Sequence, residues 1–488
     1  MRQDKFDAVR FFERHIEKSV GCTEPAAVAL ASSVAFNAIR GRLPSWLRER
    51  GVSSGGEKKG SEGGAKRESD AVESVFVRLD RGTFKNALNA VIPHTGGLSG
   101  VSLAAALGIF CEPDDGLALF NSLSGEKGRE RLRNALVLLK SGRVRVVPDY
   151  ERDEIFIFAR VRTSEGEGEC LTRRLHSEIV SVRANGDVLF DVGGECETKV
   201  KAEAAADAVA GMRVEEFISI VEHLPERAKE RLRAALETNK KAFEEARRTG
   251  KSSFAFFEAE ENGKKIEDSS KIMKEWLNKS CLMVGTAVEC RMLGLPMEVM
   301  TCAGSGNMGL TVSLPFVALK DISDLDESAE ERMLKAFALA HIVANFAASH
   351  AGFISATCGC ATKAGVGLSA ALAYFLAGFE SLTDSGGGEN VNVLVKRAIN
   401  NMVSDITGII CEGASRKCAL KASTAVISAF KSAFLALKGV EYVGGIVEND
   451  ANATLRNLGE IARAMRETDK KIVKVLERAQ NELEYSEA

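Results

Sequence analysis

The start of the chain has the hydrophobic spacing of two helices with a break between them. Gly21 interrupts the first helical pattern, and an almost continuous apolar segment follows from Ala26 to Ile39. The spacing predicts a helix on each side of the break, and Cys22 lies in the break itself. The apolar positions of the first pattern are three or four residues apart: Phe6, Val9, Phe12 and Ile16.

The pattern changes after Trp46. Residues 51–70 read GVSSGGEKKGSEGGAKRESD and contain almost no apolar side chain, which predicts a flexible insertion over 47–71. From Val72 apolar and polar residues alternate as in a strand. Two later segments repeat the alternation, and the second carries Asn185-Gly186, a hairpin signal. Strands together with polar helical segments predict a mixed α/β domain over 72–250.

The rest of the chain reads as successive helices separated by glycine-bearing turns. Its longest apolar runs, 366–379 and 422–437, are shorter than the roughly 18 to 20 residues of a membrane span or are broken by a lysine. We expect them to be buried core helices. The predicted fold class is therefore α+β: a predominantly helical catalytic domain formed by residues 1–46 and 251–488, with the mixed α/β domain inserted between them.

Composition and charge exclude several classes of protein. Of the 488 residues, 45% are hydrophobic and 27% are charged, which is a soluble globular composition. The 65 lysines and arginines against 68 aspartates and glutamates leave a net charge of −3, without the basic field that binds nucleic acid or anionic membranes. We therefore expect neither partner. The 11 cysteines are an odd number in a long chain that opens without a secretory signal, so we expect free thiols and a cytoplasmic location.

Four cysteines form two close pairs in the C-terminal half. Cys358 and Cys360 open a small-residue helix in SATCGCATKAG, and Cys411 and Cys418 are seven positions apart in IICEGASRKCALK. Thiolates bind iron-sulfur clusters and zinc, and these segments could converge on one metal centre. The alternative is that they are small buried residues of an alanine-rich core. Three ligands around an iron with one open position would create a Lewis acid for elimination chemistry.

Such chemistry needs a base, and Cys22 is the candidate. In VGCTEPAAVALA it lies just before a helix whose first turn holds Pro25, with Thr23 as the expected N-cap. The positive end of the helix dipole should lower the pKa of the thiol, so that a thiolate could act as base or nucleophile. The alternative is a buried structural cysteine at a helix start.

Glycine-rich loops could present backbone donors to an anion such as a carboxylate. In MTCAGSGNMG the residues Gly304, Ser305, Gly306 and Asn307 precede an apolar helix, and VIPHTGGLSG has a similar arrangement. The alternative for both is a tight turn between packed helices. The first loop superficially matches GxGxxG, but without a preceding strand or βαβ unit we do not expect it to bind a nucleotide.

Several other candidates stay without a role. His94 and His350 could transfer protons but are more often structural, and Lys363 could pair with a carboxylate or extend along its helix. Cys302 adjoins the 304–307 loop but has no partner at ligand spacing. The remaining cysteines are expected to pack in the core: Cys111, Cys170, Cys196, Cys281 and Cys290.

Five motifs in order along nearly the whole chain resemble the L-cysteine desulfidase family. They are GCTEPAAVALA, AGSGNMG, CGCATKAG, CEGASRKCALK and GGIVENDANATLRNLGEIARAM. The resemblance implies an oxygen-sensitive 4Fe-4S enzyme, independent of pyridoxal phosphate, that converts L-cysteine and water to pyruvate, ammonia and sulfide. It also implies kinship with the alpha domain of iron-sulfur L-serine dehydratases.

Carried over residue by residue, the resemblance implies that Cys22 accepts the α-proton and that Cys411 and Cys418 are cluster ligands. The third ligand falls in CGC; Cys360 is preferred, with Cys358 as the fallback. The 304–307 loop is a hypothesis for the substrate carboxylate. The charged insertion after Trp46, DSGGGEN and HTGG depart from the family pattern and put domain boundaries in doubt more than chemistry.

Two other functions compete with this prediction. An L-serine dehydratase would use the same chemistry with hydroxide as the leaving group, and one atom of the substrate separates the two. A non-catalytic iron-sulfur or zinc sensor would give Cys22 no reason to approach the other cysteines. The expected partner is a small amino-acid substrate, and a homo-oligomer is compatible with the sequence.

Overall fold

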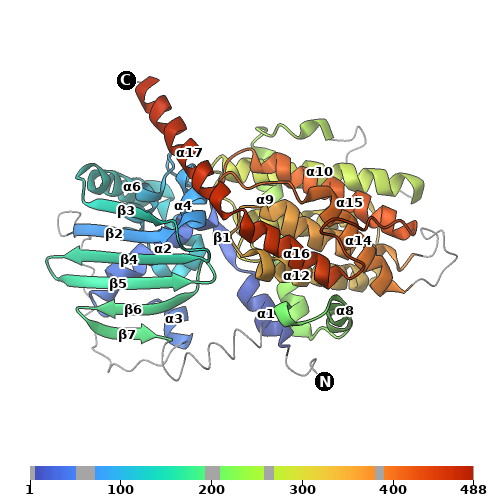
Figure 1. The fold of residues 1–488 in the computed structure, drawn as a ribbon. Coiled ribbons are helices and arrows are strands. Elements are labelled where there is room, and N and C mark those ends of the chain that lie inside the picture. Colours follow the sequence, from blue (N-terminus) through green and yellow to red (C-terminus); the bar gives the residue numbers. More distant parts are fainter. Residues whose placement is uncertain (1–5, 51–71, 193–208, 258–268, 380–389, 487–488) are drawn as a thin grey trace.

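A computed structural model describes residues 6–50, 72–192, 209–257, 269–379 and 390–486 (Figure 1). Most of the predicted flexible insertion, Cys196 and most of DSGGGEN lie outside these ranges. The described chain has a six-stranded sheet with its helices on one side of the molecule and a body of packed helices on the other (Figure 1). The α+β prediction is confirmed.

The sheet has the strand order β3-β2-β4-β5-β6-β7. Strands β2 and β3 run parallel, and each other neighbouring pair is antiparallel. The predicted hairpin is present between β6 and β7, where Asn185 and Gly186 both have positive φ. The strands are β2 (Val72–Asp80), β3 (Val144–Asp149), β4 (Phe156–Thr163), β5 (Gly166–Arg173), β6 (Ile179–Ala184) and β7 (Asp187–Asp191).

One core, which we call the sheet core, forms between this sheet and the helices on its inner face. Helix α2 lies at its centre and packs against β4, β5 and α5. Its small side chains are buried all round, so neighbouring backbones can approach closely. The helices of this core are α2 (Thr23–Ala38), α3 (Ser45–Arg50), α4 (Arg81–Leu88), α5 (Val101–Gly108), the 3-10 segment η3 (Pro113–Leu123) and α6 (Gly125–Lys140).

The contact between α2 and α5 requires a glycine. A Cβ atom on Gly108 would lie 2.2 Å from the carbonyl oxygen of Ala29 and 2.8 Å from Cβ of Ser32. We expect Gly108→Ala to lower the free energy of unfolding by about 2 kcal/mol or more, because overpacking forces the two helices apart. Thermal unfolding of Gly408→Ala is the control, since nothing lies within 4 Å of a Cβ at that position. Equal unfolding temperatures for the two variants would contradict the close approach.

The second core, the helical core, is larger and consists almost entirely of helices. Its α12 packs on α13 and α16, and α10 packs on α11 and α15. The helices are α1 (Ala8–His15), α8 (Val214–Glu222), α9 (Glu226–Arg248), α10 (Ser269–Met292), α11 (Gly306–Ile322), α12 (Glu327–Ala351), the π-helical turn η6 (Cys360–Gly365), α13 (Val366–Leu376), α14 (Val391–Ile406), α15 (Cys418–Leu437) and α16 (Ala451–Ala464), with short 3-10 turns at Val209–Gly211 and Ala255–Phe257.

The two cores do not follow the predicted domain boundaries. Helix α2, expected in the helical domain, belongs to the sheet core because its apolar surface matches the inner face of the sheet. Helices α8 and α9, expected in the mixed domain, belong to the helical core, because each buries a stripe of apolar side chains there.

Segments far apart in the sequence join the two cores. Strand β1 (Lys18–Val20) pairs antiparallel with β8 (Glu298–Met300), and Figure 1 shows β1 between the sheet and the helical body. The pairing continues one residue further, where the Thr301 amide donates to the Glu17 carbonyl at 2.9 Å. Helix α17 (Arg466–Ser486) crosses back from the helical body to contact α4. These two connections position the N-terminal residues against the C-terminal half.

Helix α15 is long and apolar enough to cross a membrane by length and composition. It is longer than the predicted apolar run because it begins at Cys418. Most of its apolar window is buried against α10, α13 and α14, as expected for a core helix.

Candidate active site

Cys22 is the N-cap residue of α2 and is buried, with 4% of its surface exposed. The N-cap therefore lies one residue earlier than the predicted cap at Thr23, and the helix begins at Thr23. The Cys22 thiol donates a hydrogen bond to Oε2 of Glu24 at 2.8 Å. The hydroxyl of Thr23 donates to the same oxygen at 3.2 Å, and Nδ2 of Asn86 donates to Oε1 at 2.8 Å. Glu24 is thus held by three donors at the start of the helix.

This environment corrects the prediction for the Cys22 thiol. Burial, followed by the charge of Glu24, raises the pKa of Cys22 well above its usual value, and these effects outweigh the helix N-terminus and Arg291. Burial also acts to raise the pKa of Glu24, but His176, the Cys22 thiol and Asn86 together hold that pKa below its usual value. At rest the pair is therefore a neutral thiol hydrogen-bonded to a carboxylate.

A chain of hydrogen bonds leads from Cys22 to the C-terminal cysteines. Asn86 in α4 donates to Glu24 through Nδ2, and its Oδ1 accepts from the Cys411 thiol at 3.5 Å. The candidate base and a candidate ligand, almost 400 residues apart in the sequence, are therefore separated by one carboxylate and one amide. The sensor alternative predicted no such approach.

Two loops bring the four C-terminal cysteines together. The segment before η6 pairs with the segment after α14 through a bridge between Thr357 and Ile410. The Cys358 amide donates to the Ile409 carbonyl at 2.9 Å, and the Cys411 amide donates to the Ala356 carbonyl at 2.7 Å. Cys360 begins the π-helical turn, a type of distortion that is frequent at functional sites. We call the four residues the thiol group: Cys358, Cys360, Cys411 and Cys418.

The members of the thiol group interact electrostatically. A hydrogen bond from the Cys360 thiol lowers the pKa of Cys358 to about 6, and the same contact raises the pKa of Cys360. Burial raises the pKa of Cys418 to about 12, with further contributions from Cys411 and Cys358. Cys358 is therefore more easily ionised than Cys360 or Cys418 when no metal is bound.

Three buried cations face these thiols. Lys363 in η6 donates to the Phe353 carbonyl at 3.1 Å, and burial lowers its pKa to about 8 against the opposing effect of Cys411 and Cys358. Lys85 in α4 donates to the Cys411 carbonyl at 2.9 Å and pairs with Asp469 of α17. Burial lowers the pKa of Arg291, and the thiols that oppose this effect are Cys22, Cys360 and Cys418. Buried positive charge compensates a group that carries net negative charge, as metal-bound thiolates do.

The thiol group fits an iron-sulfur cluster by the chemistry of its donors and by these surrounding cations. Within the described ranges, no three His, Cys, Asp or Glu side chains stand at the mutual spacing of metal ligands. The choice of Cys360, Cys411 and Cys418 as ligands, with Cys358 as the fallback, therefore stays a prediction.

The predicted carboxylate loop lies beside the thiol group. Ser305 caps α11, accepting from the Met308 amide at 3.5 Å, and Asn307 accepts from Arg291 at 2.7 Å. From the same helix, the side chain of Thr311 makes a hydrogen bond with Cys360. Strand β8 does precede the loop, but it pairs antiparallel with β1, so the βαβ unit of a dinucleotide site is not formed here.

Sequence reasoning missed several residues of the site. Glu24 could have been found from the sequence, since it is a carboxylate two positions from Cys22 in an otherwise uncharged helix. The sequence evidence for Arg291 was weaker: it is a charged residue at the end of the apolar stretch 281–292. Asn86 and His176 could not have been found in this way, because their approach to Glu24 depends entirely on tertiary packing.

The other candidates lie elsewhere. Cys302 is buried and its pKa is raised by burial, as for a core thiol. His350 packs on Phe346 and lines a cavity of about 460 Å³ between the two cores. His94 lies in the turn after Ile92, with positive φ. The other predicted core cysteines that the structure describes are buried: Cys111, Cys170, Cys281 and Cys290.

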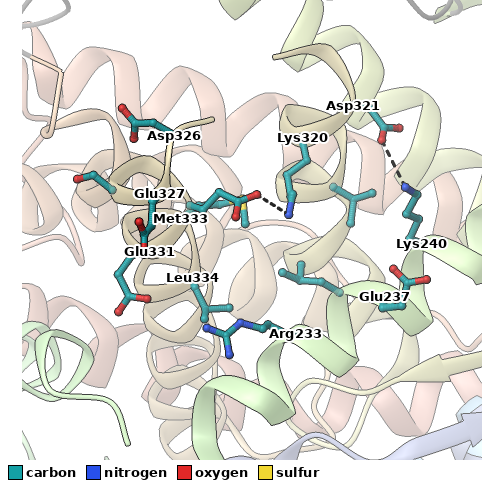
Figure 2. A pocket seen from close by; sticks show the side chains of 14 residues that line it. Arg233, Glu237, Lys240, Lys320, Asp321, Asp326, Glu327, Glu331, Met333 and Leu334 are labelled. Carbon is teal, nitrogen blue, oxygen red and sulfur yellow. Dashed lines mark ion pairs between the residues drawn. The ribbon is translucent and has the colours of Figure 1, made fainter. Parts of the chain in front are cut away.

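A separate cavity of about 1110 Å³ lies between α9, α11 and the start of α12 (Figure 2). Apolar and charged side chains line it, and two pairs of the charged ones form ion pairs: Lys320 with Glu330 at 2.8 Å, and Lys240 with Asp321 at 3.8 Å. No member of the thiol group lines it. We therefore assign the chemistry to the thiol group and not to this cavity.

Comparisons with known proteins identify the family of this chain. A family model for the serine dehydratase alpha chain matches residues 194–474. A UPF0597 protein of Desulfatibacillum aliphaticivorans is 30% identical over 472 residues, covering 94% of this chain and 95% of that protein. A UPF0597 protein of Desulfotalea psychrophila is 29% identical over 485 residues, covering 97% and 98%. Because the family match spans more than half of the chain and contains the whole thiol group, the chain belongs to the serine dehydratase alpha chain family, which supports a dehydratase or lyase type of activity.

Proposed function

We propose that this chain is an L-cysteine desulfidase, a carbon-sulfur lyase that converts L-cysteine and water to pyruvate, ammonia and sulfide. The observation that carries the proposal is the hydrogen-bonded chain from Cys22 through Glu24 and Asn86 to Cys411. It joins a proton-transfer pair to a cation-compensated group of thiols. A β-elimination needs both parts: a base for the α-proton and assistance for the leaving group.

In this proposal Cys360, Cys411 and Cys418 hold a 4Fe-4S cluster, with Cys358 as the fallback for the first of them. The bound cluster supplies a Lewis acid that assists departure of the substrate sulfur. The backbone of Gly304–Asn307 binds the substrate carboxylate at the start of α11, where amide donors and the helix dipole favour an anion. Arg291 keeps the loop in place through Asn307 and also donates to the Gly21 carbonyl beside Cys22.

Proton movement follows from the Cys22–Glu24 pair. Glu24 takes the proton of the Cys22 thiol, and the thiolate then removes the α-proton of the substrate. The electrons of the broken C–H bond form the C=C bond as the C–S bond breaks and hydrosulfide leaves. The aminoacrylate product tautomerises to an imine, and water hydrolyses the imine to pyruvate and ammonia.

To test the proposal, the full chain is purified from cytoplasm in the absence of oxygen. Its iron content, its sulfide content and its formation of pyruvate are then measured. We expect close to four irons per chain after reconstitution and faster pyruvate formation from L-cysteine than from L-serine. Faster turnover of L-serine would establish the second candidate, an L-serine dehydratase, which the family match favours. Colourless, metal-free protein that is inactive with both amino acids would contradict both.

A variant at Glu24 tests the proton-transfer pair. Because the Glu24 charge raises the pKa of the Cys22 thiol, Glu24→Gln should let Cys22 react with iodoacetamide at lower pH than in the unchanged protein. The same variant should lose turnover by about 100-fold or more, because the proton acceptor is gone. Mass spectrometry of the Cys22 peptide gives the first result and pyruvate assay the second. An unchanged alkylation profile would remove Glu24 from the mechanism.

A further inference from the structure

We propose that His176, contributed by the sheet core, binds the α-ammonium group of the amino-acid substrate together with Glu24. The inference deepens the proposed function and rests on it, since it names the part of the substrate that each side chain recognises. It makes the site composite: the sheet core supplies the recognition of the amino group, and the helical core supplies the thiol group.

The position of His176 is fixed by its loop. The residue lies between β5 and β6, two positions after Arg174, which has a φ of +69°. The Arg174 amide donates to the Ile155 carbonyl at 3.2 Å, and the Arg173 amide donates to the Glu178 carbonyl at 3.0 Å. These backbone bonds hold the loop so that the imidazole extends away from the sheet toward α2 and the 304–307 loop.

His176 is buried, with 3% of its surface exposed. Its ring makes a backbone hydrogen bond with Gly304, but Nε2, which faces Glu24, has no hydrogen-bond partner among the described residues. Buried polar atoms are nearly always hydrogen-bonded, so a ring in this state indicates a missing ligand when it faces other site residues. Burial lowers the pKa of His176. The ring is therefore neutral at physiological pH and has one nitrogen free to accept.

The ring faces Glu24 at a distance that a direct hydrogen bond does not reach. Nε2 of His176 and Oε1 of Glu24 are 4.0 Å apart. One donor nitrogen placed between them could lie about 2.8 to 3.0 Å from both. An ammonium group has several N–H donors and a positive charge that the Glu24 carboxylate favours. A small cationic donor therefore matches the pair better than an anion does.

The rest of an amino acid then falls on groups already assigned. Nδ1 of His176 lies against Gly304, where a Cβ atom would stand 3.0 Å from it, so the ring and the predicted carboxylate loop are in contact. The other oxygen of Glu24 accepts from the Cys22 thiol at 2.8 Å. An ammonium on Glu24 and a carboxylate on the loop would hold the α-carbon, one bond from each, beside the proposed base.

A second buried histidine shows that burial alone does not indicate a ligand site, and that the position of the ring relative to a carboxylate is also needed. His341 in α12 has both ring nitrogens unpartnered among the described residues. Its ring packs edge-to-face on Phe337, with centroids 4.7 Å apart, and lies near Phe12 in an aromatic cluster. Among the described residues no carboxylate forms an ion pair with His341, so this ring fills the core and serves as a matched control.

The test measures ligand binding without turnover. L-Alanine has the ammonium and carboxylate of the substrate but no leaving group, and propionate lacks the ammonium. We expect L-alanine to protect Cys22 of the metal-free chain from iodoacetamide, and His176→Leu to weaken this protection about 10- to 100-fold. Protection by propionate should be the same in both proteins. His341→Leu should leave the protection by L-alanine and the protection by propionate unchanged. His176→Gln keeps a hydrogen-bond acceptor, so it should restore part of the protection by L-alanine.

The outcomes separate this inference from the proposed function. If the unchanged chain forms pyruvate but His176→Leu keeps full L-alanine protection, the ammonium assignment is overturned. Equal weakening for propionate and L-alanine would also overturn it, since that result means a general distortion of the site. If L-alanine protection depends on His176 while neither L-cysteine nor L-serine gives pyruvate, the assignment stands and the desulfidase proposal fails. Unfolding temperatures no lower than that of the unchanged chain verify that His176→Leu is folded.

Discussion

Replacing Cys22 by alanine is expected to lower pyruvate formation by about 1000-fold while the iron content and visible absorption stay unchanged. A positioned general base contributes roughly 100- to 10,000-fold to a rate, and no second thiol is hydrogen-bonded to Glu24 among the described residues. The variant removes the base but touches neither the Asn86–Cys411 contact nor the buried cations. Iron analysis and a pyruvate assay on the same anaerobic sample measure both quantities.

Cys302→Ala is the matched control for this experiment. Cys302 is another buried thiol and lies three residues from the cap of α11, but it has no carboxylate partner in the described structure. We expect it to keep most of the activity. Loss of iron in Cys22→Ala would mean that Cys22 is a ligand and that the base has been assigned to the wrong residue.

Replacing Cys411 or Cys418 by serine is expected to lower iron retention strongly and turnover with it. A serine hydroxyl is a much poorer ligand for iron-sulfur clusters than a thiolate, and the buried cations near these positions would then lack compensating negative charge. Iron and sulfide per chain, measured after reconstitution and desalting, test this result. Full iron content in either variant would remove that residue from the ligand set.

The same assay decides between Cys358 and Cys360. Only the residue that holds the cluster should lose iron on change to serine, and the resemblance favours Cys360. Cys170→Ala provides the control, because Cys170 is a buried thiol of β5 inside the sheet core and away from the thiol group. Reduced iron in that control would mean that loss of any buried thiol disturbs reconstitution.

The sequence predicted the fold class and the local elements that depend on short-range pattern. Asn185-Gly186 gave the hairpin correctly because a tight turn needs residues that tolerate positive φ, wherever the turn is. The break around Cys22 was also predicted from local spacing. The sequence did not predict the core to which α2 belongs. A helix that is apolar all round does not indicate which surface it will contact.

The electrostatics of the site could not be predicted for a related reason. The helix start suggested a low pKa for Cys22, but the pKa depends on burial and on the orientation of the Glu24 side chain, which only the fold determines. His176 and Arg291 reach the site from loops and helices that come together through long-range contacts. Cys411 and Cys418, by contrast, are close together in the sequence itself, and their role as ligands stays a prediction that the resemblance implies.

The pairing of β1 with β8 has a consequence for how the chain is made. The partner of Lys18–Val20 is synthesised only when the ribosome reaches Glu298–Met300, a delay of tens of seconds, on the order of ten residues per second. During that interval the segment carrying Cys22 has no edge to pair with, and the loops of the thiol group do not yet exist. Assembly of the proposed site is therefore postponed until most of the polypeptide has emerged, and nascent chains that end before Glu298 lack it.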